Sequence, residues 1–280
     1  MEWKGRRKSS NVEDRRGQTP KGPMIAGGGI GGLIIIIIIA FLGGDPLSFL
    51  TDTSTPTSST PYTETADERE LTEFISVVLA DTEDVWTKVF RERGMTYEEP
   101  ELVLFTDAVQ SACGMADSAV GPFYCPGDQK LYIDLSFFEE LKTRFQAPGD
   151  FAIAYVVAHE VGHHVQYLLG TSQKVQALRG QLSEKEYNQY SVKLELQADY
   201  YAGVWAHYEK EMEYIEVGDI EEAMTAASAV GDDRIQKQAR GYVVPDSFTH
   251  GTSKQRQTWF MNGYQSGTIE DGDTFSATDL

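Results

Sequence analysis

The stretch Phe151–Gly170, FAIAYVVAHEVGHHVQYLLG, is the part of the chain around which the rest is organised. It is rich in apolar residues, contains no proline, and lies between Pro148-Gly149-Asp150 and Gly170. Aspartate is a common N-cap residue, and glycine often follows the last residue of a helix. The stretch therefore predicts one buried helix.

Its centre reads His159-Glu160-Val161-Gly162-His163. Residues four apart lie on the same face of a helix, so the imidazoles of His159 and His163 can bind one cation. Glu160 is one residue further on, rotated by about 100°, and is close enough to hold a metal-bound water. Two histidine ligands with a glutamate general base are the pattern of zinc hydrolases.

A catalytic zinc site needs a third protein ligand. The best candidates lie on a second long helix, which we expect to begin at a capping box over residues 183–186 and to end near residue 211. Glu195 and Asp199 are four residues apart there, so one carboxylate can bind the metal and the other can accept the free N–H of a ligating imidazole. The alternative is a solvated acidic face, but the small neighbours Ala198 and Ala202 favour a closely packed helix crossing.

Other side chains are candidates for a donor to the oxyanion of the transition state: His250, Arg256 and Tyr201. His250 interests us most because it lies on a predicted loop, although a loop histidine is more often a surface residue. His164 points about 100° away from His163, and His207 is two turns beyond Asp199. His164 is expected to be packed or hydrogen-bonded rather than bound to metal, and His207 to be a packed or surface histidine.

The amino-terminal part predicts a membrane anchor. Met24–Gly44 contains 21 residues without a charge, enough to span about 30 Å of hydrocarbon. It is long for the apolar region of a cleaved signal peptide, and no A-x-A site follows it. Met1–Gly22 carries seven basic residues against three acids, so the positive-inside rule predicts a single-pass protein of the cell membrane with a cytoplasmic N-terminus and an extracytoplasmic catalytic domain.

The chain divides by composition into a cytoplasmic basic segment (1–23), a transmembrane helix (24–44), a Thr/Ser/Pro-rich linker (45–67), one domain (68–270) and a polar tail (271–280). The net charge of −19 argues against a nucleic-acid partner. Cys113 and Cys125 predict either a disulfide or two free buried thiols, and an extracytoplasmic location favours the disulfide.

We expect an α+β domain that is predominantly helical. The pattern predicts helices at 68–93 (one helix, or two broken near Asp81), 138–145, 151–170, 183–211, 219–230 and 252–264. It predicts strands at 102–105 and 130–137, an irregular stretch at 108–129 and mostly loop at 231–250.

Several segments together resemble the putative neutral zinc metallopeptidase family of bacterial membrane-anchored proteins: HEVGHHVQ, LELQADYYAGVWAH, GPFYCPGDQKLYIDLSFF, GDDRIQKQ and FTHGTSKQRQTWF. The resemblance implies a gluzincin-like core, in which the motif helix packs on a second ligand-bearing helix beside a small β-sheet. It implies His159, His163 and Glu195 as zinc ligands, Glu160 as the base, and Asp199 as the partner of a ligating imidazole.

Members of this family often carry two further cysteines, at positions where this chain has Tyr200 and Gly272. The resemblance thus implies that a second disulfide is absent here, with both of its halves missing together.

These observations predict a zinc-dependent metallopeptidase, with endopeptidase activity favoured over exopeptidase activity, that acts on peptide or protein substrates. Glu160 is the predicted general base and His250 the predicted donor to the oxyanion. The strand at 130–137 could offer its edge to an extended substrate. The alternative is a non-catalytic, zinc-stabilised, membrane-anchored binding or scaffold protein; a hydrolase of a non-peptide bond is a third possibility. Replacing Glu160 with glutamine discriminates between turnover and a purely structural metal.

Overall fold

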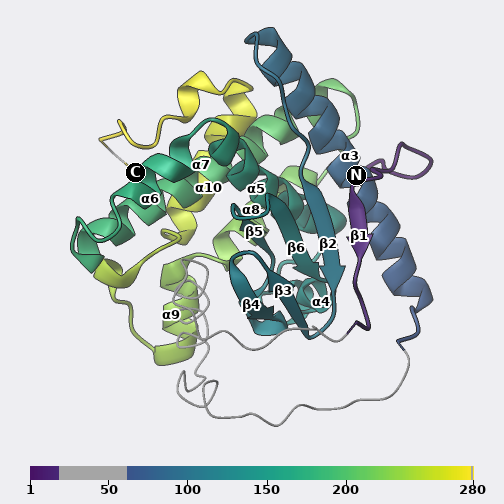
Figure 1. Ribbon diagram of the computed structural model, residues 1–280, viewed down its shortest axis with the longest axis horizontal. Coiled ribbons are helices and arrows are strands. Elements are labelled where there is room, and N and C mark those ends of the chain that lie inside the picture. The colour runs from purple at the N-terminus through teal and green to yellow at the C-terminus, as the bar shows by residue number, and fades with distance from the viewer. Residues whose placement is uncertain (19–61, 279) are drawn as a thin grey trace.

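The computed structural model describes residues 1–18, 62–278 and 280 (Figure 1). The predicted anchor, Met24–Gly44, lies outside the described residues, as does most of the predicted linker at 45–67. Within the described ranges, no helix combines the length and the apolar character that a bilayer crossing requires.

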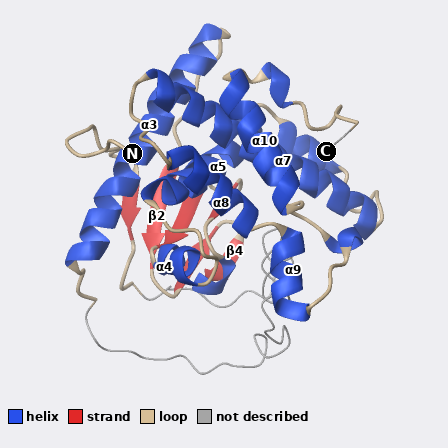
Figure 2. Ribbon diagram, turned by 180° about the vertical axis from the view of Figure 1, so that it is seen from behind, coloured by secondary structure: helices blue, strands red, loops and turns tan. Residues whose placement is uncertain are grey.

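The fold is a mixed α+β arrangement, mostly helical, with small sheets (Figures 1 and 2). The strands are β1 (Val12–Asp14), β2 (Glu101–Phe105), β3 (Ala108–Ser111), β4 (Gly114–Asp117), β5 (Phe123–Cys125) and β6 (Lys130–Asp134). The helices are α3 (Ala66–Glu92), α4 (Ser136–Thr143), α5 (Asp150–Leu168), α6 (Thr171–Ala177), α7 (Glu184–Glu211), α8 (Asp219–Ala229), α9 (Asp232–Arg240) and α10 (Ser253–Ser266). Short 3-10 turns lie at Ser118–Val120, Pro245–Ser247 and Glu270–Gly272.

The larger sheet has the strand order β1-β2-β6-β5. β1, β2 and β6 are parallel, and β5 is antiparallel to β6. Because β6 is paired on both sides, its backbone is not free to bind a substrate strand as the sequence suggested. The free edge on that side of the sheet belongs to β5.

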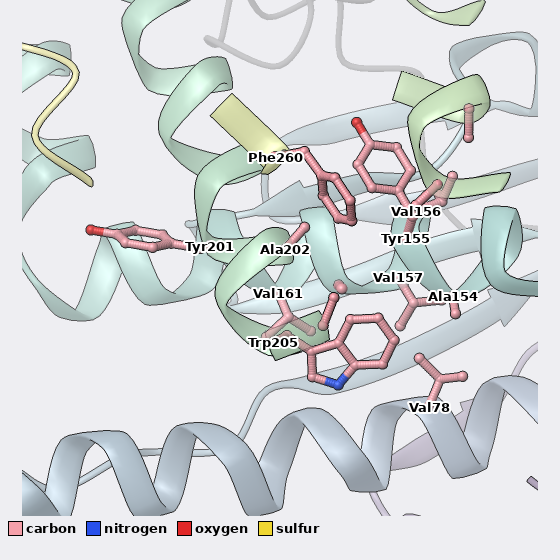
Figure 3. Packing of buried hydrophobic residues seen from close by; sticks show 14 of the residues in the cluster. Val78, Ala154, Tyr155, Val156, Val157, Val161, Tyr201, Ala202, Trp205 and Phe260 are labelled. Carbon is pink, nitrogen blue, oxygen red and sulfur yellow. The ribbon is translucent and has the colours of Figure 1, made fainter. Parts of the chain in front are cut away.

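Helix α5 lies at the centre of the domain, in contact with α3, α7, α8 and β5. Its apolar residues continue around the whole helix, as expected for a helix that is buried on most sides. Figure 3 shows Val157 and Val161 of α5 gathered with Trp205 of α7, with Val78 of α3 below them. Trp205 is fully buried, so the motif helix and the second long helix share one core.

Glycines allow α7 to approach its two main neighbours closely. At Gly162 of α5, an added Cβ would lie 2.9 Å from the carbonyl oxygen of Ala198 on α7. At Gly203 of α7 and Gly263 of α10, it would collide with the backbone of Phe260 and of Tyr200 respectively. Contacts this close hold the backbones of α5, α7 and α10 in fixed relative positions.

The long helices are close to the prediction. α3 is one unbroken helix, α5 begins at Asp150 after Gly149, and α7 begins at the predicted Ser183 capping box. The left-handed φ of 77° at Gly170 is the conformation expected just after a helix.

Three predictions about the shorter elements were wrong. Residues 108–129 are not irregular, because they form the β3–β4 hairpin and β5. The strand predicted at 130–137 ends at Asp134, because the Asp134 carboxylate accepts the N–H of Ser136 and α4 begins there. The region 231–250 holds the helix α9.

The two cysteines form the predicted disulfide, Cys113–Cys125, which links the β3–β4 turn to β5. The other two positions of interest are also neighbours. A Cβ at Gly272 would lie 2.6 Å from the Tyr200 ring, and the Tyr200 hydroxyl donates a hydrogen bond to the carbonyl of Thr268. The tyrosine ring therefore packs on the glycine at the two positions where the resemblance implied that a second disulfide is absent.

Residues 1–18, which we call the N-terminal arm, pack against the domain rather than standing apart as a separate segment. β1 extends the sheet by pairing with β2, and the arm runs along α3 (Figure 1). The sequence predicted the arm and the domain on opposite sides of a membrane. The structure describes the contacts between the arm and the domain, and the predicted topology stays a prediction.

Candidate metal centre

Helices α5 and α7 bring the three predicted ligands together. His159 and His163 each direct Nε2 toward Glu195: the distances are 3.2 Å from His159 to Oε2 and 3.5 Å from His163 to Oε1. One ligand atom from each of the three residues lies within 4.8 Å of the other two. Gly162 lies between the two histidines and faces Ala198 of α7, so the same close crossing sets the distance from the histidines to Glu195.

Asp199 holds the first histidine in a fixed tautomer. The Nδ1–H of His159 donates to Asp199 Oδ1 at 2.9 Å, which leaves Nε2 as the ring nitrogen that can bind a metal. Asp199 is fully buried. Burial alone would lower the pKa of His159, but the negative charge of Asp199 raises it to about 9. The pairing predicted between a carboxylate and a ligating imidazole is therefore present in the structure.

Arg256 and Tyr155 in turn fix Asp199. Arg256 of α10 donates to both carboxylate oxygens, from Nε to Oδ2 at 2.8 Å and from Nη2 to Oδ1 at 3.0 Å. The Tyr155 hydroxyl donates to Oδ1 at 2.5 Å. Arg256 is only 3% exposed, so it is buried behind the histidine rather than available to an oxyanion.

Gln166 plays the same part for the second histidine, and the sequence analysis missed it. The Nδ1–H of His163 donates to Gln166 Oε1 at 2.9 Å. The amide nitrogen of Gln166 donates to the carbonyl of Leu194 at 2.6 Å, one residue before Glu195. Gln166 is fully buried, and its position three residues after His163 was the one sequence signal that could have identified it.

Glu160 is 8% exposed, and among the described residues its carboxylate takes part in no recorded hydrogen bond or ion pair. Its negative charge helps to raise the pKa of His163. A buried carboxylate beside two metal-binding imidazoles, with its oxygens left free, is available to bind and deprotonate a water molecule.

His250 is held near the same centre by Asp232, the first residue of α9. Oδ2 of Asp232 accepts the backbone N–H groups of Thr249, His250 and Gly251, and Oδ1 lies 3.2 Å from His250 Nδ1. Burial alone would lower the pKa of His250, but the charge of Asp232 raises it above its ordinary value. Glu195 is close enough to His250 for each charge to shift the pKa of the other.

The other predicted candidates lie elsewhere. Tyr201 is 2% exposed and packs edge-on against Trp86 of α3, so it cannot stabilise an oxyanion at this site. His164 bonds to the Tyr124 hydroxyl and the carbonyl of Glu98. His207 bonds to the carbonyl of Tyr264. Both histidines are hydrogen-bonded away from the metal centre.

The donor set fits zinc. Two neutral imidazole nitrogens and one carboxylate are the protein ligands of a known class of catalytic zinc sites, and both imidazoles have a hydrogen-bond partner on their other nitrogen. In the absence of a metal, burial alone would raise the pKa of Glu195, but the charge of His163 and the hydrogen bonds from both histidines lower it well below its ordinary value.

Comparison with known proteins agrees with this geometry. A family model described as "putative neutral zinc metallopeptidase" matches residues 1–275. The uncharacterized protein YpfJ of Escherichia coli K12 is 46% identical over 284 residues, which cover 98% of this chain and 99% of the relative. The uncharacterized protein Rv2575 of Mycobacterium tuberculosis H37Rv is 47% identical over 196 residues, 66% of this chain and 65% of the relative. No solved structure matches the chain.

Proposed function

Because the chain belongs to the putative neutral zinc metallopeptidase family, we propose that its metal centre hydrolyses peptide bonds with Glu160 as the general base. The observation that carries the proposal is the convergence of His159, His163 and Glu195, with one ligand atom of each within 4.8 Å of the others. The unpartnered carboxylate of Glu160 next to them distinguishes a catalytic centre from a structural one, since a structural zinc site needs no free base.

Zinc bound by these three residues would supply a Lewis acid that lowers the pKa of a water molecule and polarises a carbonyl group. Glu160 accepts a proton from the attacking water and then delivers it to the nitrogen of the leaving amine. Asp199 and Gln166 hold the two imidazoles so that each Nε2 stays directed toward Glu195, where the three residues would hold the ion. The structure supports a core in which the motif helix α5 packs on the ligand-bearing helix α7, the arrangement expected of gluzincins.

His250 is the proposed donor to the negative charge that develops on the carbonyl oxygen. Its ring is fixed by Asp232, whose charge raises the pKa of His250 and so favours the protonated, donating form. A preorganised donor of this kind typically contributes about two to three orders of magnitude to turnover.

The cellular location is also a proposal. The uncharged stretch Met24–Gly44 supports attachment to a membrane, and the Cys113–Cys125 disulfide favours an oxidising compartment for the domain. The enzyme would then act on peptides or proteins outside the cytoplasm.

The test compares the full chain with Glu160→Gln, which keeps the size of the side chain but removes the base. As a matched control we suggest Glu139→Gln, an exposed position on α4. Each protein is assayed for bound zinc by elemental analysis and for cleavage of an unfolded protein substrate by mass spectrometry.

We expect one zinc per chain in all three proteins, and a loss of cleavage by at least about a hundredfold only in Glu160→Gln. Zinc without cleavage by the unaltered chain would instead support a binding or scaffold protein. A chain that neither contains zinc nor takes it up would contradict the assignment of the ligands.

A further inference from the structure

The N-terminal arm carries six described basic residues, and every one of them is used in an ion pair. Four pair with acids of α3 or α7, and two pair with acids of β1 or of the segment just before α3. The pairs are Lys4–Glu70, Arg6–Asp81 and Arg6–Glu209, Arg7–Glu83 and Arg7–Asp84, Lys8–Glu73, Arg15–Glu13, and Arg16–Asp14 and Arg16–Glu64. From this contact we propose that the arm is a built-in part of the domain, so that residues 1–18 and 62–280 lie on the same side of the membrane.

The central part of the contact is buried. Arg6 Nη2 lies 2.5 Å from Asp81, and Arg6 Nη1 lies 3.6 Å from Glu209, a residue with no exposed surface. Glu83 is 2% exposed and accepts hydrogen bonds from Arg7 and from the Ser9 hydroxyl. Buried carboxylates are costly unless they are paired, and here their partners come from the arm.

Burial raises the pKa of Asp81 to about 7 and that of Glu209 to about 8, while the charge of Arg6 acts in the opposite direction. The arm therefore supplies the cation that makes this acidic cluster tolerable. Its removal would leave Asp81 and Glu209 facing each other without a compensating charge.

The backbone of the arm is fixed as well. Val12, Glu13 and Asp14 pair in parallel with residues 102–104 of β2. The N–H of Ser9 donates to the carbonyl of Ser76 in α3 at 2.9 Å. Trp3 packs edge-on against Phe74, with 5.4 Å between the ring centroids. Strand pairing, helix contacts and ring packing together are features of an integral structural element rather than of a loosely bound tail.

The contacts of the arm give its basic residues a different role from the one that the sequence suggested. The positive-inside rule treats basic residues beside an apolar stretch as a signal that keeps them in the cytoplasm. In this protein five of the six described basic residues pair with acids outside the arm, and the sixth, Arg15, pairs with Glu13 of β1. A single crossing by the chain between residues 18 and 62 would separate the arm from that surface and break every ion pair between the arm and the domain, together with the pairing of β1 and β2.

The topology can be measured on the full chain with single cysteines at exposed positions. Ser10→Cys reports on the arm and Thr96→Cys reports on the domain; both native residues are exposed, and the two native cysteines are consumed in a disulfide. Intact cells that produce each variant are treated with a membrane-impermeant maleimide, before and after permeabilisation. We expect the two variants to behave alike. Labelling of one in intact cells and of the other only after permeabilisation would overturn the proposal.

A second measurement tests the contact itself. A carbodiimide joins a lysine to a carboxylate that is already in contact, and Lys8 Nζ lies 3.1 Å from Glu73 while both side chains are about half exposed. In membranes that contain the full chain, we expect a Lys8–Glu73 cross-linked peptide by mass spectrometry. The matched control Lys8→Arg keeps the charge but lacks the reactive amine, so this peptide should disappear. If the unaltered chain gives no cross-link between the arm and α3, the arm is not docked and the proposal fails.

Discussion

Gly162, the glycine of the HEVGH motif, should be needed for tight zinc binding, although it is not a ligand. In Gly162→Ala the new Cβ would lie 2.9 Å from the carbonyl oxygen of Ala198 and 3.1 Å from its Cα, whereas ordinary contacts begin near 3.4 Å. Both contacts are to backbone, which cannot rotate away. We therefore expect α5 and α7 to separate by about 0.5 Å at this point.

This movement acts directly on the metal centre, because His159 and His163 lie on one helix and Glu195 on the other. Metal–ligand distances tolerate a change of only about 0.2 Å. We expect the dissociation constant for zinc to rise about tenfold to a hundredfold, the range found when the support of a ligand is disturbed. Overpacking costs about 1–3 kcal/mol of folding free energy, of which alanine regains about 1 kcal/mol through its higher helix propensity.

Zinc affinity is measured by competition with a chromophoric chelator, and stability by denaturant unfolding of the metal-free protein. Gly127→Ala is the control, because its Cβ would lie 3.1 Å from the Ala112 Cβ, with Cys125 Sγ at 3.5 Å, in a turn that contributes nothing to the metal centre. Its zinc affinity should equal that of the unaltered chain. If Gly162→Ala binds zinc as tightly as the unaltered chain does, the close crossing of the helices does not set the ligand geometry, and the reasoning is refuted.

Further predictions concern protons and covalent links. Asp232→Asn removes the charge that raises the pKa of His250, so the high-pH limit of turnover should move to lower pH with zinc content unchanged; a pH–rate profile measures this, and a limit that stays in place would argue against it. In the metal-free protein the pKa of His159 is about 9, above its ordinary 6.5, so zinc uptake should release a proton from His159 at pH 7 but not at pH 10. Calorimetry in buffers of different ionisation enthalpy measures this release. Equal proton release at both pH values would argue against the raised pKa. Reduction of the Cys113–Cys125 disulfide should lower the free energy of unfolding by about 3 kcal/mol in denaturant titrations while zinc affinity stays the same.

Much of the metal centre could be predicted from the sequence because its information is local. The two histidines are one helical turn apart, and so are Glu195 and Asp199, and each pair lies on a helix whose ends carry recognisable signals. Gln166 could not be assigned in the same way. Its role depends on reaching across to the carbonyl of Leu194, and the helix crossing that permits this is a tertiary feature.

The missed elements have weak local signals for physical reasons. β3, β4 and β5 are only three or four residues long, so alternation of polar and apolar residues is barely visible in them, and their pairing is decided by the rest of the fold. α9 is strongly polar, and Ile235 is its one large apolar residue. Its N-terminal Asp232 is instead tied to the backbone of residues 249–251, a contact between parts of the chain that no sequence window contains.

The packing of Tyr200 on Gly272 has a consequence for how the carboxy-terminal segment is retained. A covalent bridge holds two segments together under all conditions except reduction, whereas a ring lying on a glycine does so only while the surrounding core stays folded. The attachment of residues 268–275 to α7 therefore does not depend on an oxidant in this chain. It is lost when heating unfolds the surrounding core. A disulfide between these two positions would be lost on reduction but would survive heating. The two kinds of attachment therefore suit environments that differ in redox state and in temperature.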